Sequence, residues 1–400
     1  MTSLKQMIIS AAFCIGAAFG VFAGTNFEVK NVEAHQRYPW NGKVDIDFLI
    51  DSSDADAEFK VTLVCTDHVG NTNLTLRTIR YSDKGEAATA FTLKPGQHRL
   101  TWDADADVPN VKLPRISFAV LANRTGEIDT AEYLVIDLSE GAEATSYPVS
   151  TRTGVPEGGW TDEYKSTKLV LRRCSAGADP LGRYTLTKDF YAGVFEVTEK
   201  QWELVMGSNP SYRKFGDTYP VEQVSYNDIR GESDGANWPS SSAVDASSFL
   251  GKLRAKTGLP ELDLPTEAQW EYTCRAGTTT TYNTGDSESA LAQAGWYGGR
   301  YEDGNSNNQK HPVGEKVANA WGLYDLHGNV WEWCLDWCRS RVTLTGTDPV
   351  GEVSGSGRSC RGGSWICGEG ADWAASSYRS GSNPSDRNLV LGFRLFRTVP

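Results

Sequence analysis

The chain has 400 residues, and its 51 Asp and Glu outnumber its 39 Lys and Arg, so the net charge is −12 at pH 7. This charge and the absence of a basic cluster argue against nucleic acid or an anionic membrane surface as a partner. At about 150 residues per domain, the length predicts two or three domains. The 40 glycines and 13 tryptophans favour a loop-rich fold pinned by aromatic side chains over a helical bundle.

The first 23 residues have the pattern of a secretory signal peptide. Lys5 supplies the positive n-region, residues 7–19 form an apolar stretch, and residues 21–23 (V-F-A) make a cleavage site. The apolar stretch is too short to span a bilayer, and no second one follows. We therefore expect an exported protein, periplasmic or extracellular, with no membrane span.

Residues 24–148 are predicted to form an immunoglobulin-like β-sandwich. Short stretches in which apolar and polar residues alternate with period two are separated by Gly, Asn, Asp and Pro, which is typical of such sandwiches. The expected strands are Val44–Ile50, Phe59–Cys65, Leu74–Ile79, His98–Trp102, Ile116–Val120 and Tyr133–Leu138, the last of them closing the domain.

The next segment, residues 149–166, has no periodicity and is rich in glycine, so we predict a linker. The second domain, residues 167–400, carries three helix signals. Capping boxes at Thr198-x-x-Gln201 and Thr266-x-x-Gln269 each predict a helix start. Between them, apolar residues with helical spacing begin at Ala246 and end before Gly258, which predicts an amphipathic helix.

The most unusual stretch is residues 321–337, W-G-L-Y-D-L-H-G-N-V-W-E-W-C-L-D-W. Trp331 and Trp333 are two residues apart, so on a strand they lie on one face. Glu332 lies between them. A carboxylate at such a place is solvated at an edge, paired with a cation, or bound to a metal, and the sequence leaves these alternatives open.

Five motifs follow one another in the second domain. They are P-V-E-Q-V-S-Y (220–226), L-P-T-E-A-Q-W-E-Y (264–272), G-N-V-W-E-W (328–333), R-G-G-S-W (361–365) and G-F-R (392–394). In these motifs and their order, the second domain resembles the formylglycine-generating enzyme, or sulfatase-modifying factor, family from about Lys168 to the C-terminus. The resemblance implies an α+β fold with little regular secondary structure, related to C-type lectins, behind the N-terminal β-sandwich. It also implies a scaffold role for Glu267, Trp270 and Glu271.

Enzymes of this family oxidise a cysteine of a protein substrate to formylglycine with O2, using Cu(I) held between two thiolates spaced C-x-x-x-x-C. By resemblance, Cys367 is the first of these thiolates, and Ser364 and Trp333 are active-site residues. The second position is Asp372. A carboxylate is a hard ligand that does not replace a thiolate on Cu(I), so we expect the two-thiolate copper site to be missing. Cys360 is an alternative partner, and Cys367 alone is also compatible with a buried structural thiol.

The resemblance also implies a structural Ca²⁺ site. Its ligands would be the main-chain carbonyls of Gly328 and Val330 and the carboxylate of Glu332, because Ca²⁺ prefers oxygen ligands.

Two functions remain open from the sequence. The first is a sulfatase-modifying-factor-like protein that acts on a protein or peptide substrate. The alternative is a non-catalytic module of C-type lectin-like fold that binds a ligand or protein through the polar residues 368–391. A third class, the iron-dependent enzymes of the same superfamily, is excluded because the five histidines show no three-His spacing.

Overall fold

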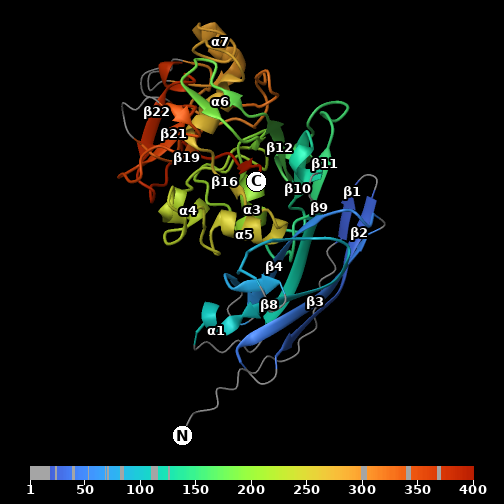
Figure 1. Ribbon diagram of the computed structural model, residues 1–400. Coiled ribbons are helices and arrows are strands. Elements are labelled where there is room, and N and C mark those ends of the chain that lie inside the picture. Colours follow the sequence, from blue (N-terminus) through green and yellow to red (C-terminus); the bar gives the residue numbers. More distant parts are fainter. Residues whose placement is uncertain are drawn as a thin grey trace. The chain divides into compact units, whose positions relative to one another are not determined.

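The computed structural model describes residues 19–22, 25–37, 41–52, 54–67, 69, 72–81, 85–109, 116–124, 127–298, 304–338, 344–366 and 371–400. The chain divides into two compact units (Figure 1). Unit 1 comprises residues 1–130, 144–151 and 252–260, and unit 2 comprises residues 131–143, 152–251 and 261–400. In the described part of the chain, no helix has both the length and the apolar character needed to cross a membrane.

Unit 1 contains two antiparallel sheets. The first has the strand order β1 (Phe19–Phe22), β2 (Thr25–Gln36), β3 (Lys43–Ser52), β8 (Gly96–Asp103) and β6 (Ile79–Tyr81). In the second, β4 (Phe59–Asp67) pairs along its whole length with β9 (Ile116–Arg124) and at its two ends with β5 (Thr72–Leu74) and β7 (Phe91–Leu93). Short helices α1 (Ala104–Asp107) and α2 (Glu127–Thr130) and strand β11 (Val149–Arg152) complete the elements that begin in this unit.

The two sheets of unit 1 share a core, as the sandwich prediction requires. Trp102 on β8 meets Phe118 on β9 edge to face, with ring centroids 5.8 Å apart. The alternation in β3 is confirmed, because its even-numbered residues from 44 to 50 are buried. The predicted strand Leu74–Ile79 is wrong. β5 ends at Leu74 and β6 begins at Ile79, because the carboxylate of Asp107 accepts hydrogen bonds from main-chain N–H groups in between.

The main sheet of unit 2 has the order β10 (Tyr133–Asp137), β12 (Lys168–Cys174), β15 (Phe190–Gly193), β24 (Phe396–Thr398) and β16 (Leu262–Asp263). The sequence predicts that Tyr133–Leu138 closes the first domain. Instead, β10 pairs antiparallel with β12 of unit 2. Residues 133–136 are all buried, so both faces of this strand are covered, which suits a sheet packed on both sides.

The remaining elements of unit 2 are short, which agrees with the predicted α+β class. There are three small sheets among the described residues. The first consists of β13 (Gly177–Ala178), β14 (Tyr184–Leu186) and β20 (Gly346–Thr347), and the second of β17 (Gly295–Trp296) and β18 (His327–Gly328). The third has the order β22 (Arg379–Ser382), β21 (Arg358–Arg361), β19 (Trp331–Trp337) and β23 (Leu391–Gly392). The helices are α3 (Glu199–Met206), α4 (Tyr226–Arg230), α6 (Glu267–Arg275) and α7 (Glu288–Ala294), with 3-10 turns η1 (Asp162–Lys165), η2 (Gly235–Asn237) and η3 (Ala371–Ala374); α5 (Phe249–Thr257) begins in unit 2 and ends in residues of unit 1.

Both predicted capping boxes are present. The side chain of Thr198 accepts a hydrogen bond from the N–H of Gln201 at the start of α3, and Thr266 and Gln269 do the same at α6. α3 ends at Gly207, whose φ of 88° lies in the left-handed region that favours glycine. The amphipathic helix predicted from Ala246 begins later, at Phe249.

The predicted linker, residues 149–166, contains β11 and η1. Within unit 2, Trp160 packs edge to face against Tyr133 and Tyr164, with ring centroids 5.1 and 5.0 Å apart. The domain boundaries themselves stay a prediction.

Candidate functional site

The tryptophan-rich stretch forms β19, which pairs with β21 on one side and with β23 on the other. Figure 1 labels β19 beside β21. β21 runs antiparallel and places Arg361 opposite Glu332, whereas β23 runs parallel and places Gly392 opposite the same residue. Arg361 begins the R-G-G-S-W motif and Gly392 begins the G-F-R motif. Three motifs that are distant in the sequence therefore meet at Glu332.

Glu332 is paired, which decides between the three alternatives left open by the sequence. Arg394 donates hydrogen bonds from Nε to Oε1 and Oε2 at 3.0 and 3.1 Å, and from Nη2 to Oε1 at 2.8 Å. The indole Nε1 of Trp270 donates to Oε2 at 2.7 Å. The side chains of Arg394 and Glu332 are only 0% and 1% exposed, so this is a fully buried, bidentate ion pair.

This arrangement does not fit a calcium ion held by Glu332, Gly328 and Val330. Ca²⁺ takes six to eight oxygen ligands, and both Glu332 oxygens already face a guanidinium whose charge would repel a second cation. Glu332 is thus a structural partner of Arg394 rather than the expected ligand.

Two further buried carboxyl groups lie near this pair. Glu196 accepts hydrogen bonds from Nδ2 of Asn329 at 2.7 Å and from the N–H of Val330 at 3.1 Å. Burial, together with the neighbouring carboxylates, raises the pKa of Glu196 well above its usual range. Burial also raises the pKa of Asp325 to about 6. Glu196, Asp325 and Glu332 are buried close together beside Arg394, so burial and their mutual repulsion favour protonation of Glu196 and Asp325.

Two glutamates of helix α6 bind the arginine that begins the R-G-G-S-W motif. Arg361 donates to Glu267 at 3.1 Å and to Glu271 at 2.8 Å. Arg379 pairs with Glu267 and Arg183 pairs with Glu271. Burial would raise the pKa of Glu271, but Arg361 and Arg183 lower it, so the carboxylate stays charged. This geometry agrees with the scaffold role expected for these glutamates.

The structure places Trp333 and Ser364 inside the protein. Trp333 is 0% exposed; its Nε1 donates to the carbonyl of Val224 at 2.9 Å, and its ring meets Tyr226 edge to face. Ser364 is also 0% exposed, and its Oγ donates to the carbonyl of Ile366 at 2.9 Å. Trp333 is therefore part of the packing between β19 and α4, and its role in an active site stays a prediction.

Cys367 lies outside the described residues. Asp372, at the position where the family has its second cysteine, is the second residue of η3 and is exposed. The donor set that this chain offers at these two positions is one thiol and one carboxylate. Such a set does not fit the two-thiolate coordination of Cu(I).

No disulfide joins the cysteines that the structure describes. Burial raises the pKa of Cys174 and Cys274 to about 12 and that of Cys334 and Cys360 well above the usual thiol range. Cys360 lies on β21, opposite Trp333 on one side and Ser380 on the other, and is 2% exposed. Its thiol is enclosed by the sheet and does not offer a second thiolate at neutral pH.

A surface cleft lies at the C-terminal end of α3. Its volume is about 520 Å³, and its walls come from α3, the following loop, the P-V-E-Q-V-S-Y motif, α4 and the loop before G-F-R. The residues that carry polar or aromatic groups into its lining are Trp202, Ser208, Tyr212, Gln223, Asp228 and Arg387.

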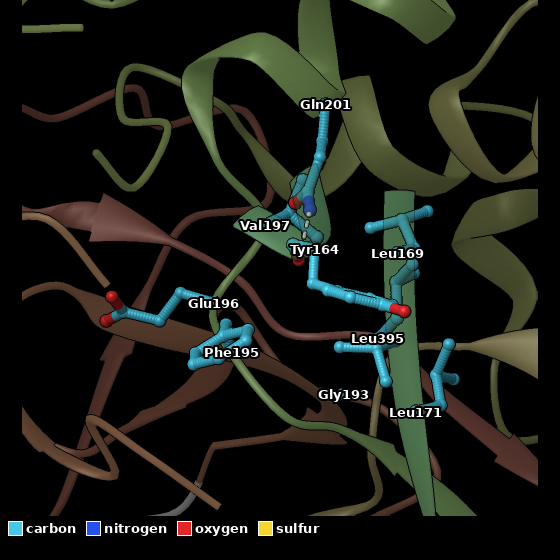
Figure 2. Close-up of a pocket in the computed structure, with 10 residues that line it drawn as sticks. Tyr164, Leu169, Leu171, Gly193, Phe195, Glu196, Val197, Gln201 and Leu395 are labelled. Carbon is cyan, nitrogen blue, oxygen red and sulfur yellow. Dashed lines mark hydrogen bonds between the residues drawn. The ribbon is translucent and has the colours of Figure 1, made fainter. Parts of the chain in front are cut away.

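Figure 2 shows a second, much smaller cavity that faces β12 and the start of α3. Gln201 extends toward it and donates from Nε2 to the carbonyls of Tyr164 at 3.4 Å and Lys168 at 2.7 Å. Its volume of about 10 Å³ holds one water molecule at most, so it is excluded as a ligand site.

The family described as "Sulfatase-modifying factor enzyme 1-like domain" matches residues 144–399, which is more than half of the chain. The chain belongs to this family. The match includes the motifs that meet around Glu332, so the buried ion pair and the α6 contacts describe how this member builds the shared domain.

Curated relatives carry different names. "Chaperone protein LppX" of Paenibacillus barcinonensis is 31% identical over 218 residues, which cover 44% of this chain and 70% of that protein. "Formylglycine-generating enzyme" of Mus musculus is 27% identical over 259 residues, covering 54% and 68%. Among solved structures, "Treponema denticola variable protein 1" is 28% identical with a TM-score of 0.47, covering 60% of this chain and 98% of that one.

Sequence reasoning missed the cleft. Its residues are far apart in the chain, from α3 to the segment before G-F-R, and only Gln223 belongs to one of the quoted family motifs, P-V-E-Q-V-S-Y. One signal was available. Arg387 lies within residues 368–391, the segment for which the sequence predicts a ligand surface.

Proposed function

We propose that this family member is an exported binding protein that does not oxidise cysteine by the two-thiolate copper mechanism. The observation that carries the proposal is Asp372, exposed on η3 at the position of the second cysteine. Cu(I) gains its stability from soft donors, and a carboxylate is a hard one. The chain keeps the scaffold of the domain but not the ligand pair.

The remaining thiols support this view. Burial raises the pKa of Cys334, Cys338 and Cys360, so none of the thiols near the R-G-G-S-W motif that the structure describes is poised as a thiolate. The hypothesis that Cys360 completes the site would require this enclosed thiol to leave the sheet.

The second candidate is formylglycine generation on a protein substrate. The family match and the order of Ser364 and Cys367 after the G-G motif favour it. Relatives named "Formylglycine-generating enzyme" also favour it. This candidate needs a partner for Cys367 that the sequence does not place at position 372.

Mass spectrometry separates the two candidates. The full chain is incubated with Cu(I), O2 and a peptide that contains the sulfatase motif C-x-P-x-R. We expect the peptide cysteine to remain unchanged. Asp372→Cys restores the missing thiol and tests whether Asp372 is the reason that the peptide stays unchanged. Asp372→Ser, which offers no thiol, is its matched control. Conversion of the peptide by the parent protein would refute the binding-protein proposal.

A further inference from the structure

The cleft at the end of α3 has the dimensions of a ligand site. Its volume of about 520 Å³ lies within the range of pockets that bind small molecules or short peptide segments, roughly 300–1,000 Å³. It is built from one unit, by residues that come from several separate segments of the chain. Such a cleft is formed by the fold itself rather than by one loop.

The aromatic part of the cleft is packed against the core. Trp202 is only 4% exposed, stacks on Phe249 at a centroid distance of 5.0 Å, and meets Phe393 edge to face at 5.9 Å. Met206, one helical turn further along α3, is half-buried. A fixed aromatic floor beside a flexible thioether suits an apolar side chain of variable shape. Stacking of a sugar ring is disfavoured there, because Phe249 already covers a face of Trp202.

The polar wall is an ion pair. Arg387 donates from Nε to Asp228 at 2.7 Å and from Nη2 to the other carboxylate oxygen at 2.6 Å. Burial would raise the pKa of Asp228, but the hydrogen bonds from Arg387 and Ser225 lower it. Both groups are therefore charged, and the pair has no net charge. A neutral wall gives no net attraction to a charged ligand, and an uncharged ligand therefore fits best.

Hydrogen-bond donors remain on this wall. The bonds of Arg387 use Nε and Nη2, so Nη1 has no partner among the residues that the structure describes. The side-chain amide of Gln223 has none there either, and its backbone φ of 63° is one that residues other than glycine rarely adopt. Tyr212, at 76% exposed, adds a hydroxyl and an aromatic ring at the rim. These groups match the carbonyl oxygens and N–H groups of a peptide backbone.

We infer that the cleft binds an uncharged, extended peptide segment that places one apolar side chain against Trp202 and Met206 and a backbone carbonyl on Nη1 of Arg387. This inference rests on the proposed function as a binding protein and names its ligand class and site. An apolar anchor side chain surrounded by polar groups is the usual anatomy of such recognition.

Selection from a phage library of random linear peptides tests the inference. The library is panned on the full chain, and selected sequences are made as synthetic peptides for calorimetry. We expect an aliphatic or aromatic residue flanked by uncharged residues. Met206→Glu, which puts a charge into the apolar part, should abolish binding, and Arg387→Ala should weaken it about tenfold through loss of a charge-assisted hydrogen bond. Val353→Glu adds the same charge at a residue that is 83% exposed and does not line the cleft, so it serves as the matched control.

Three results would overturn the inference. They are the absence of any selected peptide, binding that survives Met206→Glu, and binding to a glycan array that depends on Tyr212 and Arg387 while no peptide binds. Circular dichroism and melting curves confirm that each variant is folded, and Tyr212→Ala, at an exposed position, gives a second probe of the rim. The copper assay is independent of all of these variants, so failure of the peptide inference leaves the proposed function standing.

Discussion

The guanidinium of Arg394 holds both carboxylate oxygens of Glu332 in a pair that solvent does not reach. Trp270 of α6 completes the hydrogen bonding of the same carboxylate. Two of these residues belong to the motifs G-N-V-W-E-W and G-F-R, and the third comes from L-P-T-E-A-Q-W-E-Y. The family motifs of this chain are therefore the parts of one buried polar network, and their first role is to fix the fold.

Breaking this pair should destabilise the protein whether or not calcium is present. Glu332→Gln leaves the Arg394 charge buried without its partner, which typically costs about 3–5 kcal/mol. We expect the same loss of unfolding free energy in excess calcium and in excess chelator, measured by urea denaturation. Glu203→Gln is the control, because Glu203 pairs with Lys200 at the surface and such pairs contribute at most about 1 kcal/mol. A loss seen only with calcium would restore Glu332 as a calcium ligand.

Local features of the fold could be predicted from the sequence. The capping boxes at Thr198 and Thr266 depend on residues three positions apart, and both formed as expected. The alternation of apolar and polar residues in β3 likewise predicts which of its side chains are buried. The strand at residues 133–137 was misassigned because its run of buried residues fits either unit, and only its pairing with β12 decides.

Features that depend on contacts between distant residues could not be predicted. Glu332 and Arg394 are 62 residues apart in the sequence, and nothing near Glu332 indicates that its partner is an arginine rather than a metal. Asp228 and Arg387, in the wall of the cleft, are 159 residues apart. Trp333 was assigned to the active site from the motif, and its contacts with Val224 and Tyr226 show how it is packed, while the assignment itself stays a prediction.

Asp336 should make the protein less stable as the pH rises. It is 0% exposed and accepts a hydrogen bond from the N–H of Glu267 at 2.8 Å, and burial raises its pKa from 3.8 to about 8. The folded state thus holds a proton that the unfolded state releases. The contribution of Asp336 to the free energy of unfolding therefore falls progressively from pH 3.8 to about pH 8. Asp336→Asn carries no charge. We expect it to raise the urea midpoint at about pH 8 more than at about pH 5, since the charge that it removes is costly only above the ordinary carboxyl pKa.

The same substitution at Asp217, which is exposed, is the control for Asp336→Asn. It should shift the urea midpoint little at either pH. An Asp336→Asn variant that is destabilised equally at both pH values would show that the lost hydrogen-bond geometry outweighs the charge.

Export with cleavage after Ala23 remains a prediction, since the bond between residues 23 and 24 lies outside the described residues. Cleavage there would remove β1, residues 19–22, which pairs only with β2 at the edge of its sheet in the described part of unit 1. N-terminal sequencing of the exported protein should therefore begin at Gly24. A protein that starts at Met1, or one that carries a lipid on Cys14, would contradict the prediction. Ala23→Asp, which places a charge at the cleavage position, should block processing.

The last prediction concerns Cu(I). With Asp372 at the second ligand position, Cys367 offers one soft donor where tight coordination needs two. In a titration against a competing Cu(I) chelator, the parent protein should lose the metal, and Cys367→Ser should change this result little. Asp372→Cys should retain the metal against the same chelator, and Asp372→Ser should not. If Cys360 completes the site instead, the parent protein would bind tightly and Cys360→Ser would abolish that binding. The burial of Cys360 within its sheet and the raised pKa of its thiol argue for the first outcome. Tight, stoichiometric binding by the Cys360→Ser protein would contradict our interpretation of Asp372 and support the oxidase.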